Sequence, residues 1–141
     1  MKNVLVPVDG SESATRAVGW VSRLLAGQPG ARLHLLHVQP VIDAWEVTSH
    51  LGKDDIARFY ATGSQAVLEP AAAIAKASGL AVETHAAVGE IATEVNAHVG
   101  QLGCDAIVMG TRGRGPVTSL LLGSTTLKVI HLAEVPVTLI K

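Results

Sequence analysis

Short apolar runs alternate along this chain with segments of helical periodicity, and the alternation restricts the folds that the chain can adopt. Five runs rich in Val, Leu and Ile are expected to be strands, over residues 3–8, 32–38, 80–88, 106–109 and 135–140. The segments between them predict helices from Ala14 to Leu25 and over residues 54–77, 89–102 and 124–133. This order predicts an α/β fold in which helices cover both faces of a parallel sheet.

Two segments fit this pattern less well. Residues 41–53 show no clear period and are expected to form a loop. In the second helix, Pro70 should kink or break the chain, because proline has no N–H to donate and its ring crowds the preceding turn. The residues of this helix expected to point inward are Ile56, Phe59, Val67 and Ile74.

Composition and charge narrow the class of protein. The chain has 141 residues, of which 48% are hydrophobic and only 3% aromatic, so a single domain over 1–141 with an aliphatic core is expected. Eleven Lys and Arg against twelve Asp and Glu argue against a nucleic-acid surface. The N-terminal segment reaches Asp9 too soon for a signal peptide, and no run is long enough for a membrane span. We therefore expect a cytoplasmic protein without a membrane partner.

The segment from Asp105 to Thr126 carries the main functional signal. A strand ends at Gly110, a Gly/Arg-rich loop follows over 110–122, and Gly123-Ser124 opens a helix. Glycines let a backbone approach a ligand closely, and Ser124 could cap a helix whose first turn offers N–H groups to a phosphate. A P-loop is excluded because no G-x-x-x-x-G-K-[ST] occurs, and the dinucleotide fingerprint fails in spacing and position.

What remains is Gly110-x2-Gly113-x9-Gly123-Ser124, and with it the chain resembles the universal stress protein family in its ATP-binding branch. The segments VLVPVDGSESATRAV, LHLLHV, DAIVMGTRGRG and AEVPVTLIK also look like the family's segments in their usual order. The resemblance covers essentially the whole chain.

The resemblance implies an open five-stranded parallel sheet of order 3-2-1-4-5, of the Rossmann-like, adenine nucleotide alpha-hydrolase-like type. The nucleotide, ATP or AMP, would bind at the carboxyl ends of strands one and four, where ligands are expected in such sheets. Asp9 would face the ribose or a Mg²⁺ held mainly by the phosphates. The other residues implied for nucleotide binding are Pro7, Val8, Val38, Met109, Gly110, Arg112, Gly113, Arg114, Gly123, Ser124 and Thr125.

The resemblance also implies a homodimer. The last predicted strand, from Val135 to Ile140, would lie at the sheet edge and pair antiparallel with its twofold mate, and an exposed edge of this kind needs a cover. Nucleotide binding is expected to order the loop over 110–122 and so alter a surface read by a downstream protein partner. The expected function is a stress-response sensor or signalling module.

Several alternatives stay open. Asp9 could be an Asx-turn residue only, and Arg112 and Arg114 could be solvated loop residues. Trp45 could cover the nucleotide, or it could merely hold in place the loop to which it belongs. The chain could instead be a slow ATPase or autokinase, although no dedicated base is found and Ser124 would be the phosphate acceptor. A third alternative is a dimeric interaction module that binds no ligand.

The remaining polar residues suggest little further chemistry. His34 and His37 should face opposite sides of their strand, and His50, His85, His98 and His131 show no spacing typical of metal ligands. A metal bound by protein side chains alone is therefore not expected. The single cysteine, Cys104, is expected to be a small buried side chain.

Overall fold

The computed structural model describes residues 1–42, 45, 49–111 and 122–141. Strands and helices alternate along the chain as the sequence predicts. In order they are β1 Asn3–Pro7, α1 Glu12–Leu25, β2 Arg32–Gln39, α3 Lys53–Lys76, β3 Ala81–Val88, α4 Ile91–Leu102, β4 Ala106–Gly110, α5 Ser124–Leu132 and β5 Val137–Ile140.

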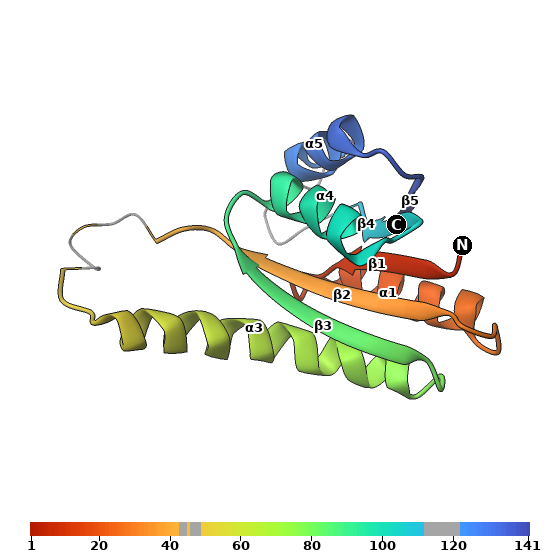
Figure 1. The fold of residues 1–141 in the computed structure, drawn as a ribbon, viewed down its shortest axis with the longest axis horizontal. Coiled ribbons are helices and arrows are strands. Elements are labelled where there is room, and N and C mark those ends of the chain that lie inside the picture. The colour runs from red at the N-terminus through yellow and green to blue at the C-terminus, as the bar shows by residue number, and fades with distance from the viewer. Residues whose placement is uncertain (43–44, 46–48, 112–121) are drawn as a thin grey trace.

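The strands form one parallel sheet of order β3-β2-β1-β4-β5, which confirms the predicted topology. Helices α1 and α3 cover one face of the sheet, and α4 and α5 cover the other (Figure 1). The order reverses between β1 and β4, because β2 follows β1 on one side and β4 joins β1 on the other. The ends of β1 and β4 therefore mark the switch point of the sheet.

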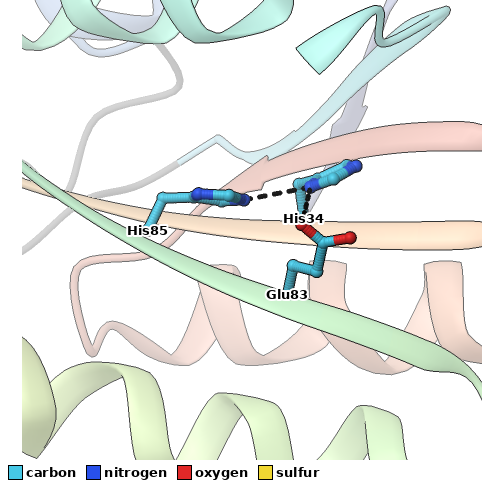
Figure 2. A group of neighbouring side chains, drawn as sticks. All are labelled: His34, Glu83 and His85. Atoms are coloured by element: carbon cyan, nitrogen blue, oxygen red, sulfur yellow. Dashed lines mark hydrogen bonds and ion pairs between the residues drawn. The ribbon is translucent and has the colours of Figure 1, made fainter.

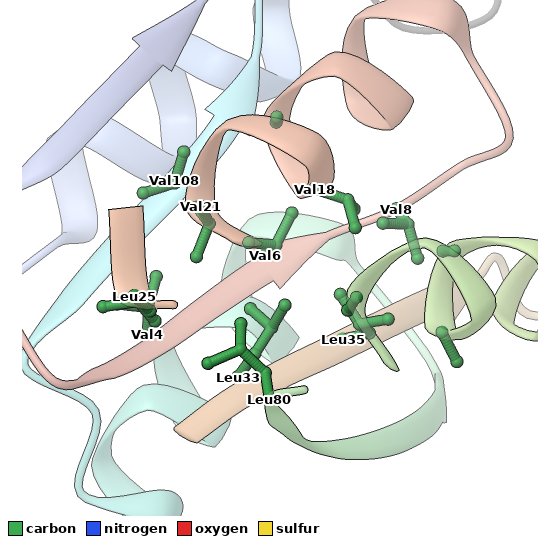
Figure 3. Close-up of a cluster of buried hydrophobic side chains, with 14 of the residues drawn as sticks. Val4, Val6, Val8, Val18, Val21, Leu25, Leu33, Leu35, Leu80 and Val108 are labelled. Carbon is green, nitrogen blue, oxygen red and sulfur yellow. The ribbon is translucent and has the colours of Figure 1, made fainter. Parts of the chain in front are cut away.

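Residues that alternate along β1 divide the core into two layers. Val4 and Val6 pack under α1 and α3, whereas Leu5 packs under α4 and α5. Figure 3 shows the first layer, in which Val18 and Val21 of α1 reach down to the valines of β1. Both faces of the central strands are thus buried, as expected for the short, continuous apolar runs in the sequence.

Helix α3 differs from its prediction in two ways. It continues through Pro70 as one helix of 24 residues, so the expected break does not occur. Pro70 and Ala66, whose carbonyl loses its N–H donor, both lie on the exposed side, where water can replace the missing hydrogen bond. Phe59 is 58% exposed rather than inward, since the first turns of α3 extend beyond the end of the sheet (Figure 1).

Small residues make up most of the buried face of α3. Its buried residues are Ser64, Leu68, Ala71, Ala72 and Ala75. Val67 and Ile74, which are predicted to point inward, pack against this core while partly buried. Among the helices that the structure describes, none is both long and apolar enough to cross a membrane.

Candidate functional site

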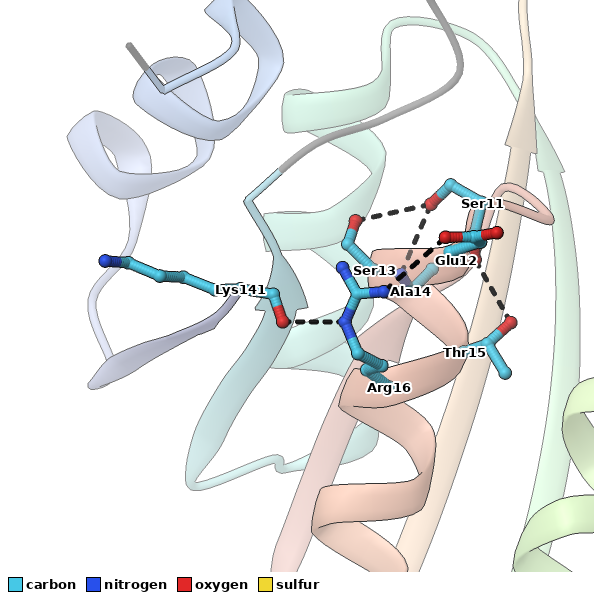
Figure 4. Close-up of polar contacts among 7 residues, drawn as sticks. All are labelled: Ser11, Glu12, Ser13, Ala14, Thr15, Arg16 and Lys141. Carbon is cyan, nitrogen blue, oxygen red and sulfur yellow. Dashed lines mark hydrogen bonds and ion pairs between the residues drawn. The ribbon is translucent and has the colours of Figure 1, made fainter. Parts of the chain in front are cut away.

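The carboxyl end of β1 turns sharply into α1. Gly10 has a φ of +82°, a conformation that favours glycine. Oδ1 of Asp9 accepts a hydrogen bond from the N–H of Ser11 at 2.9 Å, which is an Asx turn. Oγ of Ser11 in turn accepts from the N–H of Ala14 at 3.2 Å and caps the helix (Figure 4). The turn role considered for Asp9 is therefore present, and the half-buried carboxylate is held beside the strand ends.

Gly110, at the end of β4, lies against the first turn of α1. A Cβ at this position would stand 2.7 Å from the carbonyl carbon of Ser13 and 2.8 Å from the nitrogen of Ala14, and it would also overlap Oγ of Ser13. The protein itself thus requires glycine here. Close approach of a ligand is not needed to explain this residue.

The apolar residues expected around the base lie at neighbouring strand ends but on different faces. Val38 and Met109 belong to the layer under α4 and α5, together with Val129 of α5. Val8 packs in the opposite layer, and its carbonyl accepts a hydrogen bond from Nδ1 of His37 at 2.7 Å. Val38 and Met109 can therefore line one side of a site, whereas Val8 can contribute to that side only through its main chain.

The start of α5 also differs from its prediction. Gly123, not Ser124, is the N-cap residue, with φ −60° and ψ 153°, and Ser124 is the first helical residue. No side chain of the described residues caps this helix, in contrast to α1 and α4. A Cβ at Gly123 would meet no described atom within 4 Å. Unlike Gly110, Gly123 is thus not explained by packing within the described part of the chain.

Three of the residues expected to bind the nucleotide lie outside the described residues, namely Arg112, Gly113 and Arg114. Trp45 is described, and its side chain is 77% exposed. Thr125 is half-buried in the first turn of α5, and Ser124 is exposed.

Together these residues give the switch-point edge a distinct chemistry. Parallel topology places the segments that follow β1 and β4 at the same edge, so Asp9 and the start of α5 belong to that edge. The first N–H groups of a helix have no partner within the helix and carry its positive dipole end. An edge with a carboxylate, a helix start that no described side chain caps and an apolar wall is suited to a phosphorylated ligand.

The structure also brings together residues that were not expected to form a site. His34 on β2 and Glu83 and His85 on β3 place their ligand atoms within 4.8 Å of one another. Spacing along the chain does not reveal this group, because its members come from two strands. The spacing of two residues between Glu83 and His85 indicates that they share one face of β3. To predict that His34 lies beside them, the register of β3 against β2 must also be known.

Comparison with known families and relatives gives a consistent result. Residues 1–141 match the sequence model of the Universal stress protein family. The chain is 33% identical over 148 residues to a universal stress protein of Thermus aquaticus, with 99% of this chain and 98% of that protein covered. It is 30% identical over 145 residues to universal stress protein YxiE of Bacillus subtilis, with 98% and 97% covered.

Solved structures show the same fold. The protein MJ0577 superimposes with a TM-score of 0.86 at 26% identity, with 99% of this chain and 95% of that chain covered. A universal stress protein of Archaeoglobus fulgidus solved with dAMP gives a TM-score of 0.73 at 23% identity, with coverage of 100% and 98%. A family member from Arabidopsis thaliana solved with AMP gives 0.70 at 22% identity, with coverage of 100% and 92%.

Proposed function

The chain belongs to the universal stress protein family, and on that premise we propose that it binds an adenine nucleotide at the carboxyl edge of β1 and β4. The observation that carries the proposal is the start of α5, where a Cβ at Gly123 would meet no described atom within 4 Å and no described side chain caps the helix. That two proteins of the same fold were solved with AMP and dAMP supports adenine as the base.

Each part of the edge has its own role in this proposal. Main-chain N–H groups at Gly123, Ser124 and Thr125 bind the phosphates, with the Ser124 and Thr125 hydroxyls as further donors. Val38 and Met109 form the apolar wall beside the base, and Pro7 and Val8 border it through the main chain. Arg112, Gly113 and Arg114 belong to the same site by resemblance to the family motif.

Asp9 has two roles in the proposal. Its carboxylate holds the Asx turn and also faces the ribose or a phosphate-bound Mg²⁺. The donor set fits this ion, because Mg²⁺ is usually held by one or two carboxylates together with nucleotide phosphates. Gly110 contributes close packing against α1, which fixes the end of β4 where the ribose would lie.

The biological role that we propose is that of a sensor in the stress response. A ligand shifts a protein between states only by its differential affinity for them. Nucleotide at the edge would change the surface formed by the start of α5 and the β1–α1 turn, and a partner protein would read that change. We further propose that the sensor is a homodimer that pairs through residues 135–140.

Calorimetric titration of nucleotide-stripped protein with ATP and Mg²⁺, and separately with AMP, tests the binding proposal. About one nucleotide per chain is expected. Gly123→Ala should weaken binding by at least about tenfold, which corresponds to roughly 1.4 kcal/mol, because its methyl group would enter the space reserved for the phosphates. The fold should tolerate this methyl group, since no described atom lies within 4 Å of it.

Gly100→Ala is the matched control, because a Cβ there also meets nothing within 4 Å and α4 places it away from the edge. It should bind as the wild type does. Equal binding by Gly123→Ala would contradict the placement of the phosphates at α5. The absence of heat with either nucleotide would favour an interaction module without a ligand, and equal affinity for ATP and AMP would show that the triphosphate is not the signal.

A further inference from the structure

Three side chains that can bind a metal converge on the face of the sheet beneath α4. His34 lies on β2 with the buried residues Leu36 and Val38 on the same face, and Glu83 is its register partner on β3. His85 follows Glu83 by two residues and therefore points to the same face. Figure 2 shows the His85 ring and the Glu83 carboxylate both directed at the near edge of the His34 ring.

The distances between the three groups are close to those of a metal site. Nδ1 of His34 lies 3.0 Å from Nε2 of His85 and 3.8 Å from Oε2 of Glu83. Two nitrogens bound to one tetrahedral Zn²⁺ at its usual bond length stand about 3.3 Å apart. Small rotations of the side chains would therefore bring all three ligand atoms to bonding distance of one ion.

The two imidazoles already face each other through their ligand nitrogens. Nδ1 of His34 and Nε2 of His85 form a hydrogen bond, so one of them carries a proton that must move to the other nitrogen of its ring when an ion binds. Burial lowers the pKa of His34, and burial followed by the nearby His34 and His98 lowers the pKa of His85. Glu83 supplies a negative charge, and its side chain is 52% exposed, which leaves a path from solvent.

One feature of His34 opposes tight binding. Its Nε2 is buried and has no hydrogen-bond partner among the described residues, whereas metal-bound histidines usually donate their second N–H. This nitrogen lacks a described partner with or without the ion, and coordination through Nδ1 places the ring proton on it. His98 lies beside the group, with its ring centroid 6.1 Å from that of His85. Its Nδ1 donates a hydrogen bond to the Glu94 carbonyl at 2.8 Å.

We propose that His34, Glu83 and His85 form a binding site for Zn²⁺ on the flank of the sheet, with a fourth position open to water. Two imidazoles and one carboxylate form a ligand set that Zn²⁺ accepts, and a fourth, non-protein ligand completes its tetrahedron. The site is independent of the proposed nucleotide site, because His34 lies in the amino-terminal half of β2 and the nucleotide edge lies at the carboxyl ends of β1 and β4.

Zinc titration of the nucleotide-free protein in competition with a chromophoric chelator tests the proposal. One Zn²⁺ per chain is expected, together with a rise in melting temperature, since an ion that binds only the folded state stabilises it. Replacing Zn²⁺ with Co²⁺ should give the visible absorption of a tetrahedral site. Glu83→Gln and His85→Asn should each lower the affinity by more than about tenfold, because each removes a ligand.

These two positions carry the test because His34 is buried and its substitution could unfold the chain. Circular dichroism should show both variants folded. The matched control is His131→Asn, which removes an exposed histidine on α5 and should leave zinc affinity unchanged. The proposal is overturned if the wild type binds no zinc, or if Glu83→Gln and His85→Asn bind it as the control does. Neither outcome bears on nucleotide binding, which is measured without zinc.

Discussion

Gly110 lies so close to Ser13 that a methyl group at Gly110 would stand 2.7 Å from the Ser13 carbonyl carbon. This contact joins the end of β4 to the first turn of α1, and so joins the two strand ends that form the switch-point edge. Ser13 itself is buried. Two of the three atoms nearest to the added methyl group belong to the backbone of Ser13 and Ala14, which cannot rotate aside as the end of a long side chain can. One glycine of the phosphate motif therefore has a packing role that is independent of any ligand.

Gly110→Ala should accordingly destabilise the protein even without nucleotide. Overpacking of a tight contact typically costs about 1–3 kcal/mol, and the backbone of α1 must shift to admit the methyl group. Urea unfolding followed by circular dichroism measures the change. Gly100→Ala provides a contrast, since it lies in α4 with open space around it and should raise stability by up to about 1 kcal/mol. Unchanged stability in Gly110→Ala would show that the contact is looser than the structure indicates.

Glu90 makes the stability of α4 depend on pH. Its carboxylate accepts a hydrogen bond from the N–H of Thr93 at 2.7 Å, and the bonds from the Thr93 side chain and backbone lower the pKa of Glu90. A carboxylate with a lowered pKa contributes stability above its unfolded value of 4.5, and this contribution is lost as the pH falls through the lower folded value.

Glu90→Ala should therefore melt at a lower temperature than the wild type at neutral pH, and the difference should shrink in acid. Glu90→Gln keeps an oxygen acceptor without a titrating group, so its difference from Glu90→Ala should not change with pH. Thermal unfolding over the acidic range measures both. Glu90 is the N-cap residue of α4. A difference in melting temperature between wild type and Glu90→Ala that stays constant into strong acid would argue against this capping role.

Cys104 should be unreactive in the folded protein. It is only 6% exposed, and burial followed by the neighbouring charge of Asp105 raises the pKa of its thiol to about 11. Since the thiolate is the reactive form, iodoacetamide should modify the native chain far more slowly than the chain unfolded in guanidinium. Mass spectrometry over time measures the two rates. Equal rates would mean that β4 opens readily at its start.

Sequence alone predicts the alternation of strands and helices because each strand is short, aliphatic and bounded by turn residues. The strand order came from the family resemblance, and the structure confirms it. The break expected at Pro70 does not occur because Ala66, whose carbonyl loses its N–H donor, is exposed to solvent, and hydrophobic periodicity does not reveal that exposure. The packing role of Gly110 could not be predicted. A glycine that lets a ligand approach the backbone and a glycine that lets a helix pack closely cannot be distinguished from sequence. To predict that His34, Glu83 and His85 lie together, one must know the register of β2 and β3, which are separated in the chain by α3.

The free edge of β5 determines how a homodimer would form. The carbonyl of Pro136 accepts a hydrogen bond from Ile107 of β4, and the carbonyl of Ile140 accepts one from Thr111, just after β4. The backbone groups of these even-numbered residues therefore face inward. The N–H and C=O of one strand residue point to the same side, and the side alternates along the strand. Val137 and Leu139 therefore present their backbone groups to the outer edge. The neighbouring helix α5 exposes further apolar surface, with Leu127 53% and Leu132 48% exposed.

If two copies pair along this edge, Val137→Pro should give a monomer, because it removes an outward N–H while leaving the bonds to β4 in place. Proline is tolerated at such an edge position, so the fold should persist. Val137→Ala is the matched control, since it shortens the side chain but keeps the N–H, and it should remain a dimer. Sedimentation velocity at micromolar concentration distinguishes these states. A wild-type monomer would refute the dimer, and a dimeric Val137→Pro variant would show that the chains associate through another surface, with the apolar face of α5 the next to be tested.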